Sequence, residues 1–260
     1  MSADALYAAP LFDPLRHWLE RLPPRPDAQA VAELAEQFPI HTENGQRVRF
    51  VPPRPDGQVY ECRIWDSGEV ETRTDNWHDF FNALVWLSFP QTKIAVSAAH
   101  MRAMQAPGAA RGTARDALTH FDECGIGVLS TQPELLDLLR GFRWKELFVD
   151  RREDVKRCMR FVIFGHATYE QLLKPFRGLT AKAILCDIPE EWLVLDAKAL
   201  NATVDGIFSA KLKSGQYARP RDFQPLPLLG IPGVTPDSED PAYYDDTWQF
   251  RPGRQRLAAA

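Results

Sequence analysis

The sequence has few of the features that reveal a function directly. Only four of its 260 residues are cysteines, and Cys62, Cys124, Cys158 and Cys186 form no C-x-x-C pair. This spacing argues against a disulfide framework or a structural zinc site and indicates a reducing compartment. No window approaches the roughly 20 consecutive apolar residues of a membrane span, and the N-terminus does not read as a signal peptide. We therefore expect a cytoplasmic protein that does not associate with membranes.

Positive charge is not in excess either. The chain carries 31 Lys and Arg residues against 35 Asp and Glu residues, a formal net charge of −4, which counts against nucleic acid as a partner. The sequence also lacks the patterns G-x-x-x-x-G-K-[ST], G-x-G-x-x-G, H-E-x-x-H and G-x-S-x-G. Signatures of nucleotide binding, zinc proteolysis and serine hydrolysis are therefore absent.

The composition is otherwise that of a globular protein with a large core. Hydrophobic residues make up 45% of the chain and charged residues 25%, which is ordinary for a globular domain. Many of the 21 prolines cluster at 23–26, 52–55 and 220–241, and the last cluster favours irregular, extended structure near the C-terminus. We predict a single α+β domain with N-terminal helices over 1–40, a core over 41–218 and an extended proline-rich arm over 219–260.

The densest apolar block covers residues 76–100 and reads NWHDFFNALVWLSFPQTKIAVSAAH. Large apolar residues occur on both sides of the helical wheel of its first half, which is typical of a helix buried nearly all round. Pro90 then begins a second helix, because proline is well tolerated in a first turn. We predict that the two helices form a buried hairpin packed on a small mixed or antiparallel sheet.

Polar side chains inside this block are the first candidates for a site. His78 and Asn82 are four residues apart and point the same way, and Lys93, Ser97 and His100 form a stripe on the second helix. An unpaired buried polar group costs about 1–3 kcal/mol, so these side chains need partners. We predict a polar pocket between the helices, with His78 catalytic and Asn82, Lys93 and His100 binding substrate. Purely structural hydrogen bonds are the alternative explanation.

Asp79 and the motif FGHATYE supply further candidates. Asp79 is either a metal ligand or a residue that stabilises the start of its helix, with Asn76 as the cap. In the motif, the missing side chain of Gly165 permits close approach by another element or a ligand. His166 is therefore the second catalytic candidate, and Glu170, four residues later, is a substrate-binding candidate.

Acidic residues accompany the segment 117–130, which we predict as two short strands around a turn. Carboxylates at a strand end are typical of metal and acid–base sites. We take Asp116 and Asp122 as metal-ligand candidates and Arg115 as a substrate-binding candidate. Glu123 is interpreted as an ordinary turn residue.

The periodicity of the remaining segments predicts further elements. Residues 154–174 fit a helix, with a strand over 161–164 as the alternative. The other predicted elements are helices over 13–21, 27–38, 131–139 and 195–213, strands over 45–51 and 181–188, and a β-hairpin over 58–73.

Four stretches, NWHDFFNALVWLSFPQTK, RDALTHFDECG, FGHATYEQLL and PLPLLGIPG with the following EDPAYYDD, resemble DUF3025, a bacterial family of unknown function. The resemblance extends over most of the chain, and the motifs are long and specific as a set. It implies one continuous domain. Because the family has no established activity, the resemblance implies no catalytic residue.

Two functional hypotheses follow. The first is a metal-assisted hydrolase or transferase for a small or phosphorylated substrate, in which histidines and carboxylates hold a divalent ion; without a metal, His78 or His166 is the general base. The second is a non-catalytic binding or interaction module. In that case the exposed aromatic residues Tyr243, Tyr244 and Trp248 of the arm dock a partner or complete a homo-oligomer.

Overall fold

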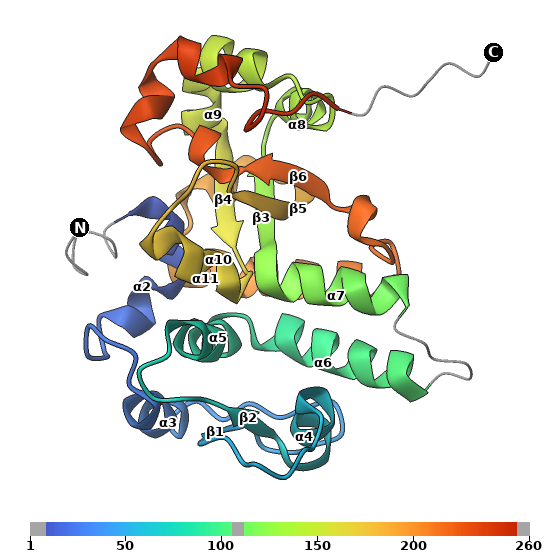
Figure 1. Ribbon diagram of the computed structural model, residues 1–260. Coiled ribbons are helices and arrows are strands. Elements are labelled where there is room, and N and C mark those ends of the chain that lie inside the picture. Colours follow the sequence, from blue (N-terminus) through green and yellow to red (C-terminus); the bar gives the residue numbers. More distant parts are fainter. Residues whose placement is uncertain (1–8, 106–111, 254–260) are drawn as a thin grey trace.

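A small mixed sheet lies at the centre of the protein (Figure 1). The computed structural model describes residues 9–105 and 112–253. The two inner strands are parallel to each other and each outer strand is antiparallel to its neighbour. Every residue of β3 is buried, as expected for a strand covered on both faces. In spatial order the strands are β4 (Met159–Ile163), β3 (Gly125–Ser130), β5 (Thr180–Asp187) and β6 (Gln224–Pro227).

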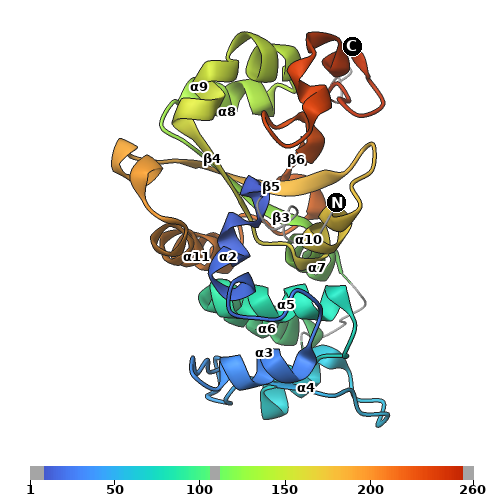
Figure 2. The ribbon, with the colours of Figure 1, turned by 90° about the vertical axis from the view of Figure 1, so that its left-hand side faces the viewer.

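Helices form layers on both sides of this sheet. In Figure 1 the helices α8 (Pro133–Arg140) and α9 (Arg152–Cys158) lie above it, and α7 (Thr113–Cys124), α10 (His166–Leu173) and α11 (Ala197–Lys213) lie below it. Figure 2 shows α2 (Asp13–Leu19) beside α11. The layer farthest from the sheet, here called the N-terminal layer, consists of α3 (Ala28–Ala35), α4 (Tyr60–Ser67) and the parallel strands β1 (Arg49–Val51) and β2 (Glu69–Glu71).

The two predicted buried helices are present as α5 (Trp77–Ser88) and α6 (Pro90–Gln105), between the sheet-side helices and the N-terminal layer. They do not form the expected hairpin, because Figure 1 shows α5 nearly along its axis and α6 from the side. All residues of α5 from Asp79 to Ser88 are buried. The helix starts as predicted, because Oδ1 of Asn76 accepts a hydrogen bond from the backbone N–H of Asp79 at 2.9 Å. No helix in the described ranges has both the length and the apolar character needed to cross a bilayer.

A side chain from another helix caps the start of α6. The carboxylate of Asp205, on α11, accepts hydrogen bonds from the backbone N–H groups of Gln91 at 2.9 Å and Thr92 at 2.7 Å, and from the Thr92 hydroxyl at 2.6 Å. These are donors that the first turn of a helix leaves unsatisfied. Burial raises the pKa of Asp205. This carboxylate therefore links α11 to the first turn of α6.

Replacing Asp205 by alanine is expected to destabilise the protein by about 2–4 kcal/mol, because the variant loses a cap and leaves buried donors unpaired. Asp196 is the matched control, since it caps the exposed start of α11 through Ala199 N at 2.8 Å. Asp196→Ala is expected to cost about 1 kcal/mol. Urea denaturation measures both values, and equal losses would contradict the prediction.

The predicted β-hairpin over 58–73 is wrong. Its first half is the helix α4, which ends at Gly68 with a φ of 71°, and β2 then pairs with β1 instead of returning along residues 58–65. Helix formation buries Arg63 where its guanidinium reaches Glu69 at 3.5 Å and Glu71 at 3.1 Å. These tertiary ion pairs override the alternating pattern of the sequence.

Two further segments differ in part from the prediction. The first half of segment 117–130 is helix α7, whose buried face is formed by Ala117, Leu118 and Phe121, and only the second half is a strand. Segment 154–174 contains the alternative strand, β4, between α9 and α10. In both segments a helix is followed directly by a strand, so the spacing of apolar residues changes within a few residues. A prediction that assigns one periodicity to the whole segment misses this change.

The C-terminal arm is more closely integrated than predicted. Part of it forms β6, an edge strand in which Pro225 and Pro227 are tolerated because one strand edge faces no partner. The expected exposure of Tyr244 is wrong: only 5% of the residue is accessible, and its hydroxyl donates to the Gly230 carbonyl at 2.8 Å. Trp248 is exposed, as predicted.

Candidate functional site

Gly165 brings two distant segments of the chain together. A Cβ atom at this position would lie 2.4 Å from the Gly125 nitrogen and 2.5 Å from Cys124 Cα. The backbone N–H groups of Phe164 and Gly165 both donate to the Gly125 carbonyl, at 2.9 and 2.8 Å. The close approach predicted for this glycine is therefore confirmed, and it sets the first residue of α10 against the last turn of α7.

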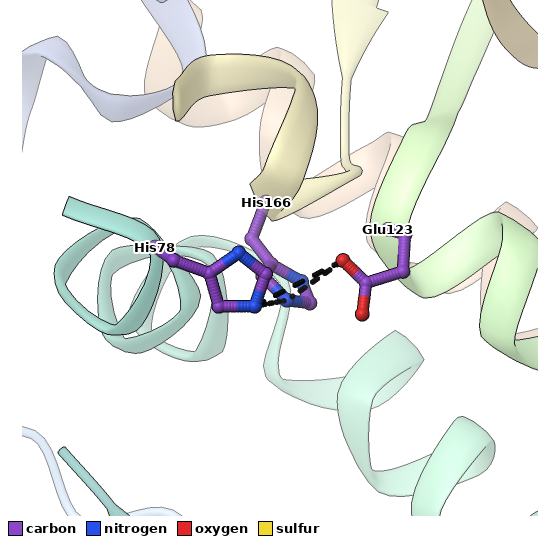
Figure 3. Close-up of side chains that lie close together, drawn as sticks. All are labelled: His78, Glu123 and His166. Atoms are coloured by element: carbon purple, nitrogen blue, oxygen red, sulfur yellow. Dashed lines mark hydrogen bonds and ion pairs between the residues drawn. The ribbon is translucent and has the colours of Figure 1, made fainter. Parts of the chain in front are cut away.

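Three side chains from three helices converge at this junction (Figure 3). His78 extends from α5, Glu123 from α7 and His166 from α10. The two Nε2 atoms are 3.1 Å apart, and Oε2 of Glu123 lies 3.4 Å from Nε2 of His166 and 3.9 Å from Nε2 of His78. The two histidines predicted as catalytic candidates thus share one site.

The spacing of these atoms suits a divalent metal ion. All three ligand atoms lie within 4.8 Å of one another. Metal bonds of ~2.1 Å in tetrahedral geometry place ligand atoms ~3.4 Å apart, close to the observed separations. A carboxylate only accepts hydrogen bonds, so Nδ1 of His78 donates to Oε2 of Glu170 at 3.1 Å, and Nε2 is the His78 nitrogen that faces the other two side chains. Such a carboxylate behind a ligating histidine is typical of metal sites.

The electrostatics of the cluster also favour a cation. Burial holds the pKa of His166 down at about 3, so the imidazole is neutral at pH 7 and can act as a ligand. Burial, together with the neighbouring Asp122 carboxylate, raises the pKa of Glu123. Glu123, Asp122 and Glu170 thus gather around the two imidazoles, and a divalent ion would compensate the charge of these carboxylates.

A buried lysine organises the adjoining part of the site. Nζ of Lys93 donates to Oδ1 of Asp122 at 2.6 Å and to Oδ1 of Asn82 at 2.9 Å, and Nδ2 of Asn82 donates to the Tyr60 hydroxyl at 2.9 Å. Burial alone would raise the pKa of Asp122, but the Lys93 ammonium outweighs it and the pKa lies below its usual value. The Lys93 ammonium also lies 5.4 Å from the centre of the Trp86 ring.

The His78–Glu123–His166 cluster and the lysine network line one cavity of about 410 Å³, a size typical of small-molecule sites. Glu170 is not among the residues that line the cavity, but it forms a hydrogen bond with His78, which is. Arg115 and Asp116 are in the first turn of α7 and are not among the residues described as lining it. The predicted residues that line the cavity are His78, Asp79, Asn82, Lys93, His100, Asp122 and His166.

Two acidic residues have partners in the structure that the sequence analysis did not identify. Asp79 pairs with an arginine, and Glu123 faces the two histidines. Asp79 forms a two-pronged ion pair with Arg73, at 2.8 and 2.9 Å. Glu123, interpreted from sequence as a turn residue, is instead in the last turn of α7 and faces the two histidines. An amphipathic helix ending in two consecutive acidic residues, Asp122 and Glu123, was the signal that could have identified it.

Comparison with known proteins places this site in a family. The profile described as "Protein of unknown function (DUF3025)" matches residues 48–254, which is most of the chain. The chain belongs to this family. No curated protein and no solved structure matches it. The DUF3025 match contains the three converging side chains and the whole Lys93 network, so the site is built entirely from this domain.

Adding one methyl group at Gly165 of the DUF3025 domain is expected to damage this site. Gly165→Ala forces Cβ against backbone atoms of Cys124 and Gly125, so we expect a loss of about 1–3 kcal/mol in stability and weaker metal binding. Gly206, inside α11, is the control, because a Cβ there meets nothing within 4 Å; Gly206→Ala should stabilise by about 0.5–1 kcal/mol. Thermal unfolding and metal titration distinguish the two variants, and similar behaviour would contradict the prediction.

Proposed function

We propose that the protein is a metal-dependent hydrolase that acts on a small molecule. The observation that carries this proposal is the convergence of His78, Glu123 and His166 on one point beside a cavity. Two histidines and one glutamate are a ligand set used by catalytic zinc sites, which keep a further coordination position open for water or substrate. The same set with open positions also suits other divalent transition metals.

Each residue of the site has a role in this proposal. A bound divalent ion would lower the pKa of a coordinated water and polarise a substrate oxygen. His78, Glu123 and His166 would hold the ion, and Glu170 orients the His78 ring by accepting a hydrogen bond from its Nδ1–H group. Lys93 keeps Asp122 ionised beside the ligands. The cavity accommodates the substrate on the same side.

Support for the interaction-module hypothesis is weaker, because, of the three aromatic residues expected to be exposed, Tyr244 is buried, Tyr243 is half-buried and Trp248 alone is exposed. The four cysteines are free, which supports the proposed cytoplasmic location. Neither point depends on the metal site.

Metal analysis of the full-length protein tests the proposal. Protein purified without chelator should contain about one equivalent of a divalent metal. After stripping, Zn²⁺, Mn²⁺ and Fe²⁺ are returned separately, and activated esters, amides and phosphate esters are screened for hydrolysis. We expect hydrolysis that requires added metal and is lost in Glu123→Gln. Protein that takes up none of these ions would refute the metal site, and metal-loaded protein that hydrolyses no substrate class would refute the hydrolase.

A further inference from the structure

We propose that the part of the cavity beyond Lys93 is a subsite, formed by Trp86, Ser97 and His100, that binds an uncharged carbonyl group of the substrate, such as an amide or a lactam. Lys93, Ser97 and His100 occupy successive turns of one face of α6, so the stripe extends ~10 Å along the helix axis. The proposal rests on the proposed hydrolase function for its reaction, but binding at this subsite is measurable without any reaction.

Four buried polar atoms in the cavity wall have no hydrogen-bond partner among the described residues. One is Nδ1 of His166, beside the His78–Glu123–His166 cluster, and the other three lie in the proposed subsite. They are Nε1 of Trp86, Oγ of Ser97 and Nδ1 of His100, in residues that are 1%, 7% and 5% exposed. All three residues line the same cavity. Buried polar groups in proteins are nearly always paired, so the cavity contents must supply the missing partners.

Other buried tryptophans show that Trp86 is exceptional. The indole N–H of Trp18 donates to Oγ of Ser88 at 2.9 Å, and that of Trp144 donates to the Arg251 carbonyl at 2.8 Å. Both are satisfied within the fold. The missing hydrogen-bond partner of the Trp86 indole is therefore a property of the cavity wall and does not reflect poor packing of the core.

The unpaired groups specify the chemistry of their partner. The Trp86 indole can only donate, and the Ser97 hydroxyl has a proton to donate. Lys93 has three N–H donors, of which Asn82 and Asp122 use two. A group rich in acceptors, such as a carbonyl oxygen, satisfies this set. Burial lowers the pKa of His100, so its neutral ring can accept a hydrogen bond from an adjacent amide N–H.

The charges around the cavity argue against a phosphorylated or carboxylate group. Among the described residues, one arginine and one lysine line it, and both are already paired, Arg73 with Asp79 at 2.8 Å and Lys93 with Asp122 at 2.6 Å. No described lysine or arginine that lines the cavity lacks a carboxylate partner, so an anion at this subsite, away from the proposed metal position, would bring a charge without a counter-ion, and burying such a charge is unfavourable. An uncharged group avoids this penalty. The acidic residues that line the cavity are Glu61, Glu71, Asp79, Asp122 and Glu123.

Indole N–H resonances of the ¹⁵N-labelled full chain provide the test. 2-Pyrrolidinone and N-methylacetamide are the carbonyl probes, and phenyl phosphate and n-butylamine are the charged controls. We expect the carbonyl probes to shift the Trp86 signal and leave those of Trp18 and Trp144 in place. Ser97→Ala should weaken 2-pyrrolidinone binding about two- to tenfold, the effect of one neutral hydrogen bond. Trp86→Phe assigns the signal; if that variant does not fold, replacing each other tryptophan in turn assigns it by elimination.

The proposal is overturned if phenyl phosphate or n-butylamine shifts the Trp86 signal more than the carbonyl probes do. It is also overturned if no probe shifts the signal at 100 mM, since ordered water would then be the partner. Metal content measured on the same samples separates the two proposals. A responsive Trp86 in protein that binds no metal would refute only the hydrolase, and a metal-loaded protein with an unresponsive Trp86 would refute only the subsite.

Discussion

His166→Ala is expected to lose its divalent metal while the protein stays folded. The substitution removes one of three ligand atoms at the centre of the cluster, and losing even an outer-shell partner typically lowers metal affinity 10–100-fold. We therefore expect affinity to fall at least about hundredfold, and hydrolysis with it. Calorimetric titration of stripped protein with Zn²⁺ measures the affinity, and circular dichroism checks the fold.

Two further variants make this result specific. Glu170→Gln keeps all three ligands but changes the group behind His78, so we expect an intermediate loss of about 10–100-fold. His120→Ala is the matched control, because His120 is an exposed histidine on α7, three residues before Glu123. Its affinity should equal that of the unmodified protein. A full-affinity His166→Ala protein would contradict the assignment of the ligands.

Lys93→Met is expected to cause the largest loss of stability, about 3–5 kcal/mol, because it leaves the carboxylate of Asp122 buried without its counter-ion. The double variant Lys93→Met with Asp122→Asn removes the uncompensated charge and should regain more than half of the loss. Urea denaturation at pH 7 measures the free energy of unfolding of the unmodified protein, Lys93→Met and the double variant, each without metal. A double variant no more stable than Lys93→Met would contradict this explanation.

The pH dependence of this loss has a definite sign. Lys93 holds the pKa of Asp122 below its usual value, so the ion pair contributes fully above about pH 4 and its contribution is lost as the pH falls through the lower folded pKa. In Lys93→Met the unpaired Asp122 becomes protonated on acidification and ceases to destabilise. The stability difference between the two proteins should therefore narrow at low pH. A difference that is constant with pH would show that lost packing, not charge, is responsible.

Features set by neighbouring residues could be predicted from the sequence. The helix cap at Asn76, the buried helices α5 and α6 and the shared side of His78 and Asn82 all depend on local spacing. The role of Gly165 was also predictable, because only a missing side chain allows such close backbone approach. These inferences were sufficient to select both histidines of the site.

Features set by contacts between distant segments could not be predicted. Glu123 was taken for a turn residue because α7 was expected to be a strand, and only the helix directs it toward His78 and His166. Likewise, nothing in the sequence near Gln91 indicates that Asp205 caps its helix. In each case the deciding partner lies far along the chain, beyond the reach of periodicity.

The origin of the three ligands in separate helices has a consequence for the life of the folded protein. Because α5, α7 and α10 are joined only through the completed fold, an unfolded chain presents no ready-made site. An ion bound only by the native state stabilises it by about 2.7 kcal/mol at a free concentration 100 times its Kd. Metal supply would therefore set the steady-state abundance of the protein as well as its activity, and starvation for metal would expose the chain to proteolysis.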